Sequence, residues 1–164
     1  MSEDRLQRSS EQLGQLLQLR GLRVVTAESC TGGWIGKALT DIAGSSAWVE
    51  GGFISYSNQC KQSMLGVDPA LLQHHGAVSE SVVRAMAAGA LQRTGADLSI
   101  AVSGVAGPAG GSAGKPVGLV WFAWARAAGE VRAESVRFSG DREAVRLEAA
   151  IFALRGLRGW LDVG

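Results

Sequence analysis

The chain has 164 residues, of which 46% are hydrophobic and 19% are charged, and its formal net charge at pH 7 is +1. A chain of this length and composition is typical of one globular domain, and we expect residues 1–164 to form a single domain. The small net charge argues against binding to nucleic acid or to an acidic membrane surface, and no apolar run approaches the roughly 20 residues that span a bilayer.

The N-terminus lacks a basic segment followed by an apolar one, so no secretion signal is visible and we expect a cytoplasmic protein. Two cysteines, Cys30 and Cys60, are too few for a disulfide framework or a zinc site. We therefore expect both cysteines to be reduced structural thiols. Glycine is the outlier, with 23 copies, about twice the usual ~7%.

The first third of the chain alternates between helix-like and strand-like patterns. Leucines at near-helical spacing predict a helix over residues 1–20, and a short apolar run predicts a strand over 22–27. A glycine-rich turn at 28–33 then leads into a predicted helix over 34–42. Residues 48–56 form the next predicted strand, in which Gly51-Gly52 indicates a bulge or the close approach of a ligand.

The rest of the chain continues this alternation and adds a hairpin. Serine caps, glycine stops and apolar spacing define each element. The predicted elements are a helix over 57–66, a short helix over 69–74, a helix from 79 to 91, a strand over 98–102, a long glycine-rich loop over 103–116, two antiparallel strands over 117–125 and 131–138, and a helix from 141 to 161.

Strands that alternate with helices predict an α/β fold, here a three-layer α/β/α single domain with a mixed, mostly parallel sheet. In open α/β sheets, ligands bind at the loops that follow the carboxyl ends of the strands. These loops are 28–33, 56–61 and 103–115, and each is polar and carries glycine or a reactive side chain. We expect them to line one shared pocket.

One candidate catalytic site combines Ser46, Tyr56 and Lys61. A serine hydroxyl becomes a nucleophile when a neighbouring base takes its proton, and a lysine serves as that base when it is neutral. With a reference pKa near 10.4, only about 0.04% of lysine side chains are neutral at pH 7, so the site must lower this pKa. The spacing does not distinguish Ser46 from the adjacent Ser45.

Ser29 is the rival nucleophile, because it follows a predicted strand and precedes a predicted helix. The nucleophile-elbow pattern requires glycine two residues away on each side, whereas Ala27 and Thr31 occupy these positions. We therefore rank Ser29 below Ser46 and expect it to bind ligand. Cys30 is a weaker alternative nucleophile, since neither histidine has an evident link to it.

Several short motifs carry a resemblance that covers nearly the whole chain in order. They are Thr-Ala-Glu-Ser-Cys-Thr-Gly-Gly at 26–33, Tyr56-Ser57-Asn58 with Lys61, Gly-Ala-Val-Ser at 76–79, Gly104 to Pro108, Lys-Pro-Val-Gly at 115–118 and Ser-Gly-Asp-Arg at 139–142. The sequence resembles the CinA C-terminal domain family, and within it the stand-alone bacterial amidohydrolases that act on nicotinamide nucleotides.

The resemblance implies hydrolysis of the carboxamide of nicotinamide mononucleotide to the carboxylate and ammonia, in pyridine nucleotide salvage. It makes Ser46 the nucleophile, Lys61 its base and Tyr56 a supporting hydroxyl, and it implies a homodimer or larger assembly without a cofactor. The substrate-binding residues that it implies are Ala27, Glu28, Ser29, Cys30, Thr31, Gly32, Gly33, Ser103, Gly104, Gly107 and Arg142.

The electrostatics of the proposed mechanism suggest where the substrate's phosphate binds. A phosphate close to Lys61 would favour the charged ammonium and oppose its role as a base. We therefore expect the phosphate near Arg142 or the Gly32-Gly33 turn. Two other functions stay open at this point: a non-catalytic, regulatory nucleotide-binding domain, and an amidase for a related carboxamide.

Overall fold

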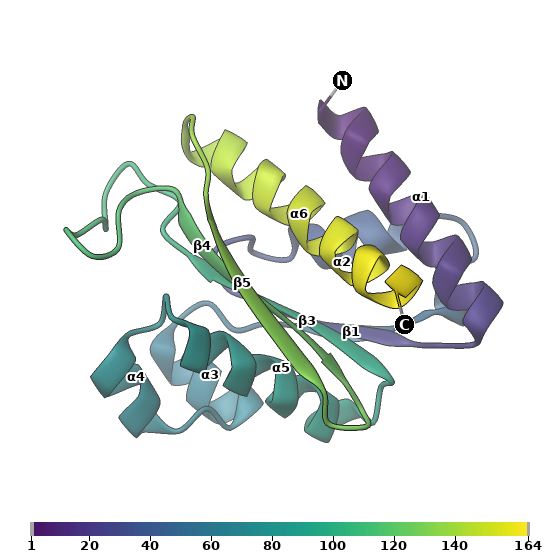
Figure 1. The fold of residues 1–164 in the computed structure, drawn as a ribbon, viewed down its shortest axis with the longest axis horizontal. Helices are drawn as coiled ribbons and strands as arrows, with labels where there is room; N and C mark the ends of the chain where they lie inside the picture. Colours follow the sequence, from purple (N-terminus) through teal and green to yellow (C-terminus); the bar gives the residue numbers. More distant parts are fainter. Residues whose placement is uncertain (1, 164) are drawn as a thin grey trace.

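A computed structural model describes residues 2–163, which form a five-stranded sheet covered by helices on both faces (Figure 1). The helices are α1 (Ser2–Arg20), α2 (Trp34–Thr40), α3 (Asn58–Leu65), α4 (Pro69–His75), α5 (Glu80–Thr94) and α6 (Arg142–Val163), with a short 3-10 helix η1 (Ser45–Ala47). The strands are β1 (Val24–Glu28), β2 (Val49–Ile54), β3 (Leu98–Gly104), β4 (Leu119–Arg126) and β5 (Val131–Arg137).

The strand order is β2-β1-β3-β4-β5. β1 pairs in parallel with β2 and β3, whereas β4 runs antiparallel to both β3 and β5, so four of the five strands point the same way. The predicted α/β/α fold with a mixed, mostly parallel sheet is confirmed. The hairpin of β4 and β5 is confirmed as well, with strand ends shifted by one or two residues from those expected.

Each face of the sheet has its own apolar core. Helices α1, α2 and α6 cover one face, and α3, α4 and α5 cover the other, as Figure 1 shows. Successive strand residues point to opposite faces. Val24 of β1 accordingly packs into the first core, whereas Val25 and Ala27 pack into the second. β1 and β3 are buried almost throughout because helices cover both of their faces.

The glycine pair in β2 has two consequences for its pairing with β1. The register shifts between Val24, which pairs with Val49, and Val25, which pairs with Gly51, so the strand carries the predicted bulge. A Cβ atom at Gly52 would lie 2.4 Å from the Thr26 Oγ1 atom, so only glycine allows this close approach of the two strands. The close neighbour of Gly52 is thus the Thr26 side chain of β1.

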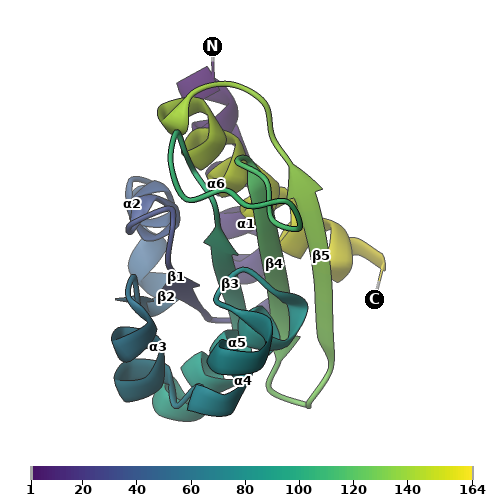
Figure 2. The ribbon, with the colours of Figure 1, turned by 90° about the vertical axis from the view of Figure 1, so that its left-hand side faces the viewer.

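The helices of residues 2–163 include none that is long and apolar enough to cross a bilayer. The long loop between β3 and β4 runs past the beginning of α6 (Figure 2). Its position matters for the site, because α6 starts beside the carboxyl ends of the central strands.

Candidate active site

The carboxyl ends of the three parallel strands meet at one edge of the sheet. Glu28, the last residue of β1, is in register with Ile54 of β2 and Val102 of β3. The following loop is fixed to both neighbours, because the Ser29 amide donates to the Val102 carbonyl (3.0 Å) and the Ser55 amide donates to the Glu28 carbonyl (2.8 Å). Residues distant in the chain therefore come together there.

At this edge, the buried residues Ser29 and Lys61 form a small cluster with the backbone carbonyl of Tyr56. The Lys61 Nζ atom donates to Ser29 Oγ at 2.9 Å and to the Tyr56 carbonyl oxygen at 2.8 Å. Ser29 Oγ in turn donates to the same carbonyl at 3.1 Å. A serine hydroxyl and a lysine amine at this distance are within the range required of a nucleophile and its general base.

The environment of Lys61 favours a neutral amine. Its side chain is 1% exposed, and within the described part of the chain it forms no ion pair with a carboxylate. Burial lowers the pKa of Lys61 below its usual value, because the charged ammonium loses its hydration, while the thiols of Cys30 and Cys60 oppose this effect. Lys61 thus has the character of a base.

The position of Lys61 follows from a helix cap. Ser57 is the N-cap of α3, where its hydroxyl accepts a hydrogen bond from the Cys60 amide at 3.0 Å. This cap begins the helix directly after Tyr56, and the amide of Lys61 closes the first turn on the Ser57 carbonyl. The side chain of Lys61 is thereby directed from the first turn back to the loop after β1.

Cys30 lies beside the cluster but does not have the properties of a nucleophile. It is 6% exposed, and burial raises the pKa of its thiol to about 11, with Glu28 adding to this effect. The thiol therefore stays protonated at neutral pH, and the protonated form is not the reactive one. Cys30 is therefore not our candidate for the nucleophile.

The side chains of Glu28 and Thr31, both predicted to bind substrate, form hydrogen bonds within the turn between β1 and α2. The Glu28 carboxylate accepts hydrogen bonds from the Thr31 hydroxyl (2.6 Å), the Ile35 amide (2.9 Å) and the Gly36 amide (2.9 Å). Both side chains are buried. We infer that they position the loop between β1 and α2, and Glu28 also satisfies amide groups of the first turn of α2.

Arg142 connects two of the site loops. Its Nη1 atom donates to the Gly107 carbonyl at 2.8 Å, and its Nη2 atom donates to the Tyr56 hydroxyl at 3.4 Å. The Tyr56 side chain itself is 59% exposed, so its carbonyl reaches the buried cluster while its ring stands at the mouth of the site. The structure thus brings Arg142, Tyr56 and Gly107 together near the Ser29–Lys61 pair.

Ser46 lies at the other end of the sheet, so the expected contact between Ser46 and Lys61 is not formed within the chain. Ser46 is exposed in η1, and its carbonyl accepts a hydrogen bond from Arg23, the residue directly before β1, at 2.9 Å. Ser29 directly follows β1. The five residues of β1, at about 3.3 Å each, separate the two ends by roughly 16 Å. Ser45 is in η1 too and does not replace Ser46 in the site.

The other predicted substrate-binding residues have the following places in the fold. Ala27 is fully buried in β1, and Ser103 is buried in β3. A Cβ atom at Gly104 would lie 2.7 Å from a methyl group of Val120, so this glycine allows close strand packing. Gly32 and Gly33 have φ values of 60° and 100°, which turn the chain into α2.

The sequence analysis did not single out Arg146, which holds the loop that carries Ser29. Its Nε atom donates to the Cys30 carbonyl at 3.0 Å, and its Nη2 atom donates to the Thr31 carbonyl at 3.4 Å. Arg146 lies four residues after Arg142, one turn further along α6. Because residues four apart share a helix face, this spacing was the available signal.

Comparison with protein families identifies the chain. The model of the CinA C-terminal domain matches residues 6–161. The chain belongs to this family. The family resemblance that the sequence motifs suggested is therefore confirmed.

Within the described residues, no group of three or more His, Cys, Asp or Glu side chains is placed to hold a metal ion.

Curated relatives and solved structures in the CinA family are similar over almost the full length. The nicotinamide-nucleotide amidohydrolase PncC of Escherichia coli K12 is 56% identical over 157 residues, which cover 96% of this chain and 95% of the relative. The PncC protein of Pseudomonas putida is 52% identical, with 88% and 90% covered. The crystal structure of a competence/damage inducible protein from Agrobacterium tumefaciens superposes with a TM-score of 0.93, at 44% identity and 96% coverage of both chains.

Proposed function

We propose that this CinA-family protein is a nicotinamide-nucleotide amidohydrolase that uses Ser29 as nucleophile and Lys61 as general base. The observation that carries this proposal is the 2.9 Å contact between Ser29 Oγ and a buried Lys61 amine that has no carboxylate partner among residues 2–163. The names of the PncC relatives support nicotinamide mononucleotide as substrate and nicotinate mononucleotide and ammonia as products.

The reaction begins with proton transfer inside the cluster. In neutral Lys61, one N–H bond stays directed at the Tyr56 carbonyl. The Ser29 hydroxyl turns its hydrogen from that carbonyl to the Nζ lone pair, which accepts the proton along the 2.9 Å contact. As this proton moves to Nζ, Oγ forms a bond to the carboxamide carbon. The Tyr56 carbonyl thus orients the base.

The second half of the reaction uses the same two groups. The Lys61 ammonium returns its proton to the departing nitrogen, the C–N bond breaks and ammonia leaves, so the acyl group remains on Ser29 Oγ. A water molecule then gives a proton to Lys61 and attacks the ester. Its cleavage releases the carboxylate and restores the serine hydroxyl.

Arg142 is the residue that we assign to the substrate's phosphate. It is exposed at the mouth of the site, and its contacts to Gly107 and Tyr56 hold it near the cluster without using all five guanidinium hydrogens. Lys61 is turned away from solvent toward Ser29. A phosphate on Arg142 would leave Lys61 neutral, as the mechanism requires.

An ammonia-release assay with wild type, Ser29→Ala and Ser46→Ala tests the proposal. Nicotinamide mononucleotide, nicotinamide riboside and free nicotinamide serve as substrates. We expect wild type to prefer the mononucleotide, Ser29→Ala to lose at least about 10⁴-fold in kcat, and Ser46→Ala to stay within about twofold. Loss of activity in Ser46→Ala with activity kept in Ser29→Ala would reverse the assignment, and tight binding without ammonia release would indicate a regulatory binding domain.

A further inference from the structure

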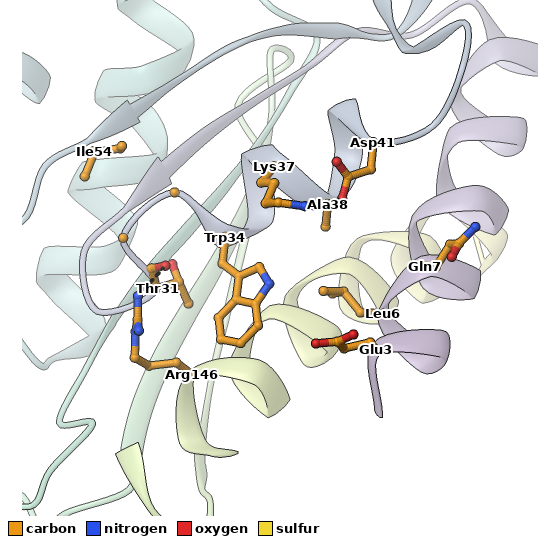
Figure 3. Close-up of a pocket in the computed structure, with 12 residues that line it drawn as sticks. Glu3, Leu6, Gln7, Thr31, Trp34, Lys37, Ala38, Asp41, Ile54 and Arg146 are labelled. Atoms are coloured by element: carbon orange, nitrogen blue, oxygen red, sulfur yellow. Dashed lines mark hydrogen bonds and ion pairs between the residues drawn. The ribbon is translucent and has the colours of Figure 1, made fainter. Parts of the chain in front are cut away.

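A cleft of about 880 Å³ lies between α1, α2 and α6, apart from the Ser29–Lys61 cluster (Figure 3). It shares only the turn formed by Thr31, Gly32 and Gly33 with the proposed substrate-binding residues. It opens on the sheet face that α1, α2 and α6 cover, whereas Lys61 belongs to α3 on the opposite face. Its volume falls within the range of about 300–1,000 Å³ that is usual for small-molecule sites.

The central wall of the cleft is aromatic. The indole of Trp34 projects between Arg146 and Leu6, as Figure 3 shows. Trp34 is only partly buried, and Ile54, 55% exposed, adds apolar surface at the far side of the glycine turn. A partly exposed indole beside aliphatic side chains is suited to stacking with a planar ring.

Four charged side chains line the cleft: Glu3, Lys37, Asp41 and Arg146. Lys37 is paired with Asp41 at 2.7 Å. The guanidinium carbon of Arg146 lies 5.6 Å from the Trp34 ring centroid, and the acceptors of Arg146 are the carbonyl oxygens of Cys30 and Thr31. Among the described residues, no carboxylate pairs with Arg146, so its positive charge is available to an anionic group of a ligand.

We propose that this cleft is a second ligand site, which binds a planar aromatic ring carrying a phosphate, as in a 5′-mononucleotide. The ring stacks on Trp34, and the phosphate pairs with Arg146, whose guanidinium carbon lies 5.6 Å from the centroid of the same indole. Ring and anion together account for the aromatic wall, the unpaired cation and the size of the cleft.

Arg146 connects this site to the catalytic loop. Its side chain holds the carbonyls of Cys30 and Thr31, the two residues that follow Ser29, and a Cβ atom at Gly32 would lie only 3.1 Å from its Nη2 atom. A phosphate that draws the guanidinium toward the cleft weakens these two hydrogen bonds. Ligand in the cleft therefore lowers kcat and leaves the binding of the carboxamide substrate unchanged.

Calorimetric titration with adenosine 5′-monophosphate tests the site without relying on turnover. Ribose 5-phosphate, which lacks the ring, and adenosine, which lacks the phosphate, are the comparison ligands. The protein variants are Trp34→Leu, Trp34→Phe, which keeps an aromatic plane, and Trp160→Leu. Trp160 in α6 is the matched control, because an arginine also lies over its indole. The guanidinium carbon of Arg126 is 4.3 Å from the ring centroid, and Trp160 does not line the cleft.

We expect the nucleotide to bind wild type and Trp160→Leu equally, and Trp34→Leu about 5- to 150-fold more weakly, as the loss of one stacking contact implies. Trp34→Phe should recover most of the affinity, which separates stacking from misfolding. Equal affinity for Trp34→Leu and wild type, equal affinity for ribose 5-phosphate and the nucleotide, or no binding at all would overturn the proposal. So would inhibition of ammonia release that only raises KM, because it would place the nucleotide in the catalytic site.

Discussion

Lys61→Met is the substitution that tests the role of the buried amine most directly. Methionine has a similar length and keeps the apolar contacts, but it removes the proton acceptor of Ser29. Activation by a general base contributes about 10²–10⁴-fold, and residues that act as a unit with a nucleophile reach higher values. We expect kcat to fall on the order of 10⁴-fold, equivalent to about 5 kcal/mol of transition-state stabilisation.

The same substitution changes how stability depends on pH. The pKa of Lys61 is lowered by burial in the folded chain and returns to about 10.4 on unfolding. Between these two values the unfolded state binds more protons, so the free energy of unfolding of wild type rises with pH, by at most about 1.4 kcal/mol per pH unit from this group. Below the folded-state pKa the penalty is fully present. Lys61→Met lacks this rise.

Urea unfolding of wild type, Lys61→Met and Lys115→Met over the range from about pH 7 to about pH 10, just below the unfolded-state pKa, measures this difference. Ammonia release from nicotinamide mononucleotide is measured alongside. Lys115 is the control, because its amine donates to the His75 carbonyl and not to Ser29 or Tyr56. It should keep the wild-type pH slope. The reasoning fails if Lys61→Met retains turnover, or if its stability has the same pH slope as that of wild type.

Two further predictions concern stability alone. The pKa of Cys30 is raised to about 11, so its contribution to stability is fully present below about pH 8.5 and is lost as the pH rises toward 11. Between pH 8.5 and 10.5, the free energy of unfolding in urea should therefore decrease less for Cys30→Ala than for wild type. An equal decrease would contradict this. A Cβ atom at Gly89 would lie 1.9 Å from the Leu65 carbonyl oxygen, whereas one at Gly159 would have no neighbour within 4 Å. Gly89→Ala should therefore lower the free energy of unfolding by about 1–3 kcal/mol, and Gly159→Ala should raise it by up to about 1 kcal/mol. Thermal unfolding that ranks the two variants in the opposite order would refute the packing argument.

The sequence by itself determined the fold. Apolar spacing, serine caps such as Ser57 and glycine stops such as Gly66 act within a few residues of each other, so they can be read along the chain. The same local signals predicted the loops after β1, β2 and β3, which carry the candidate site. They also placed Lys61 in the first turn of a helix, where the structure has it.

Only the tertiary structure decided which serine meets Lys61. Ser46 is closer to Lys61 in sequence than Ser29 is, but β2 runs the length of the sheet between Ser46 and Lys61, so the two residues lie at opposite ends. Ser29 is 32 residues from Lys61, and parallel pairing of β1 with β2 brings the ends of these strands together. β2 thus separates Ser46 from Lys61, and its parallel pairing with β1 brings Ser29 to Lys61. The register that does this exists only in the assembled sheet.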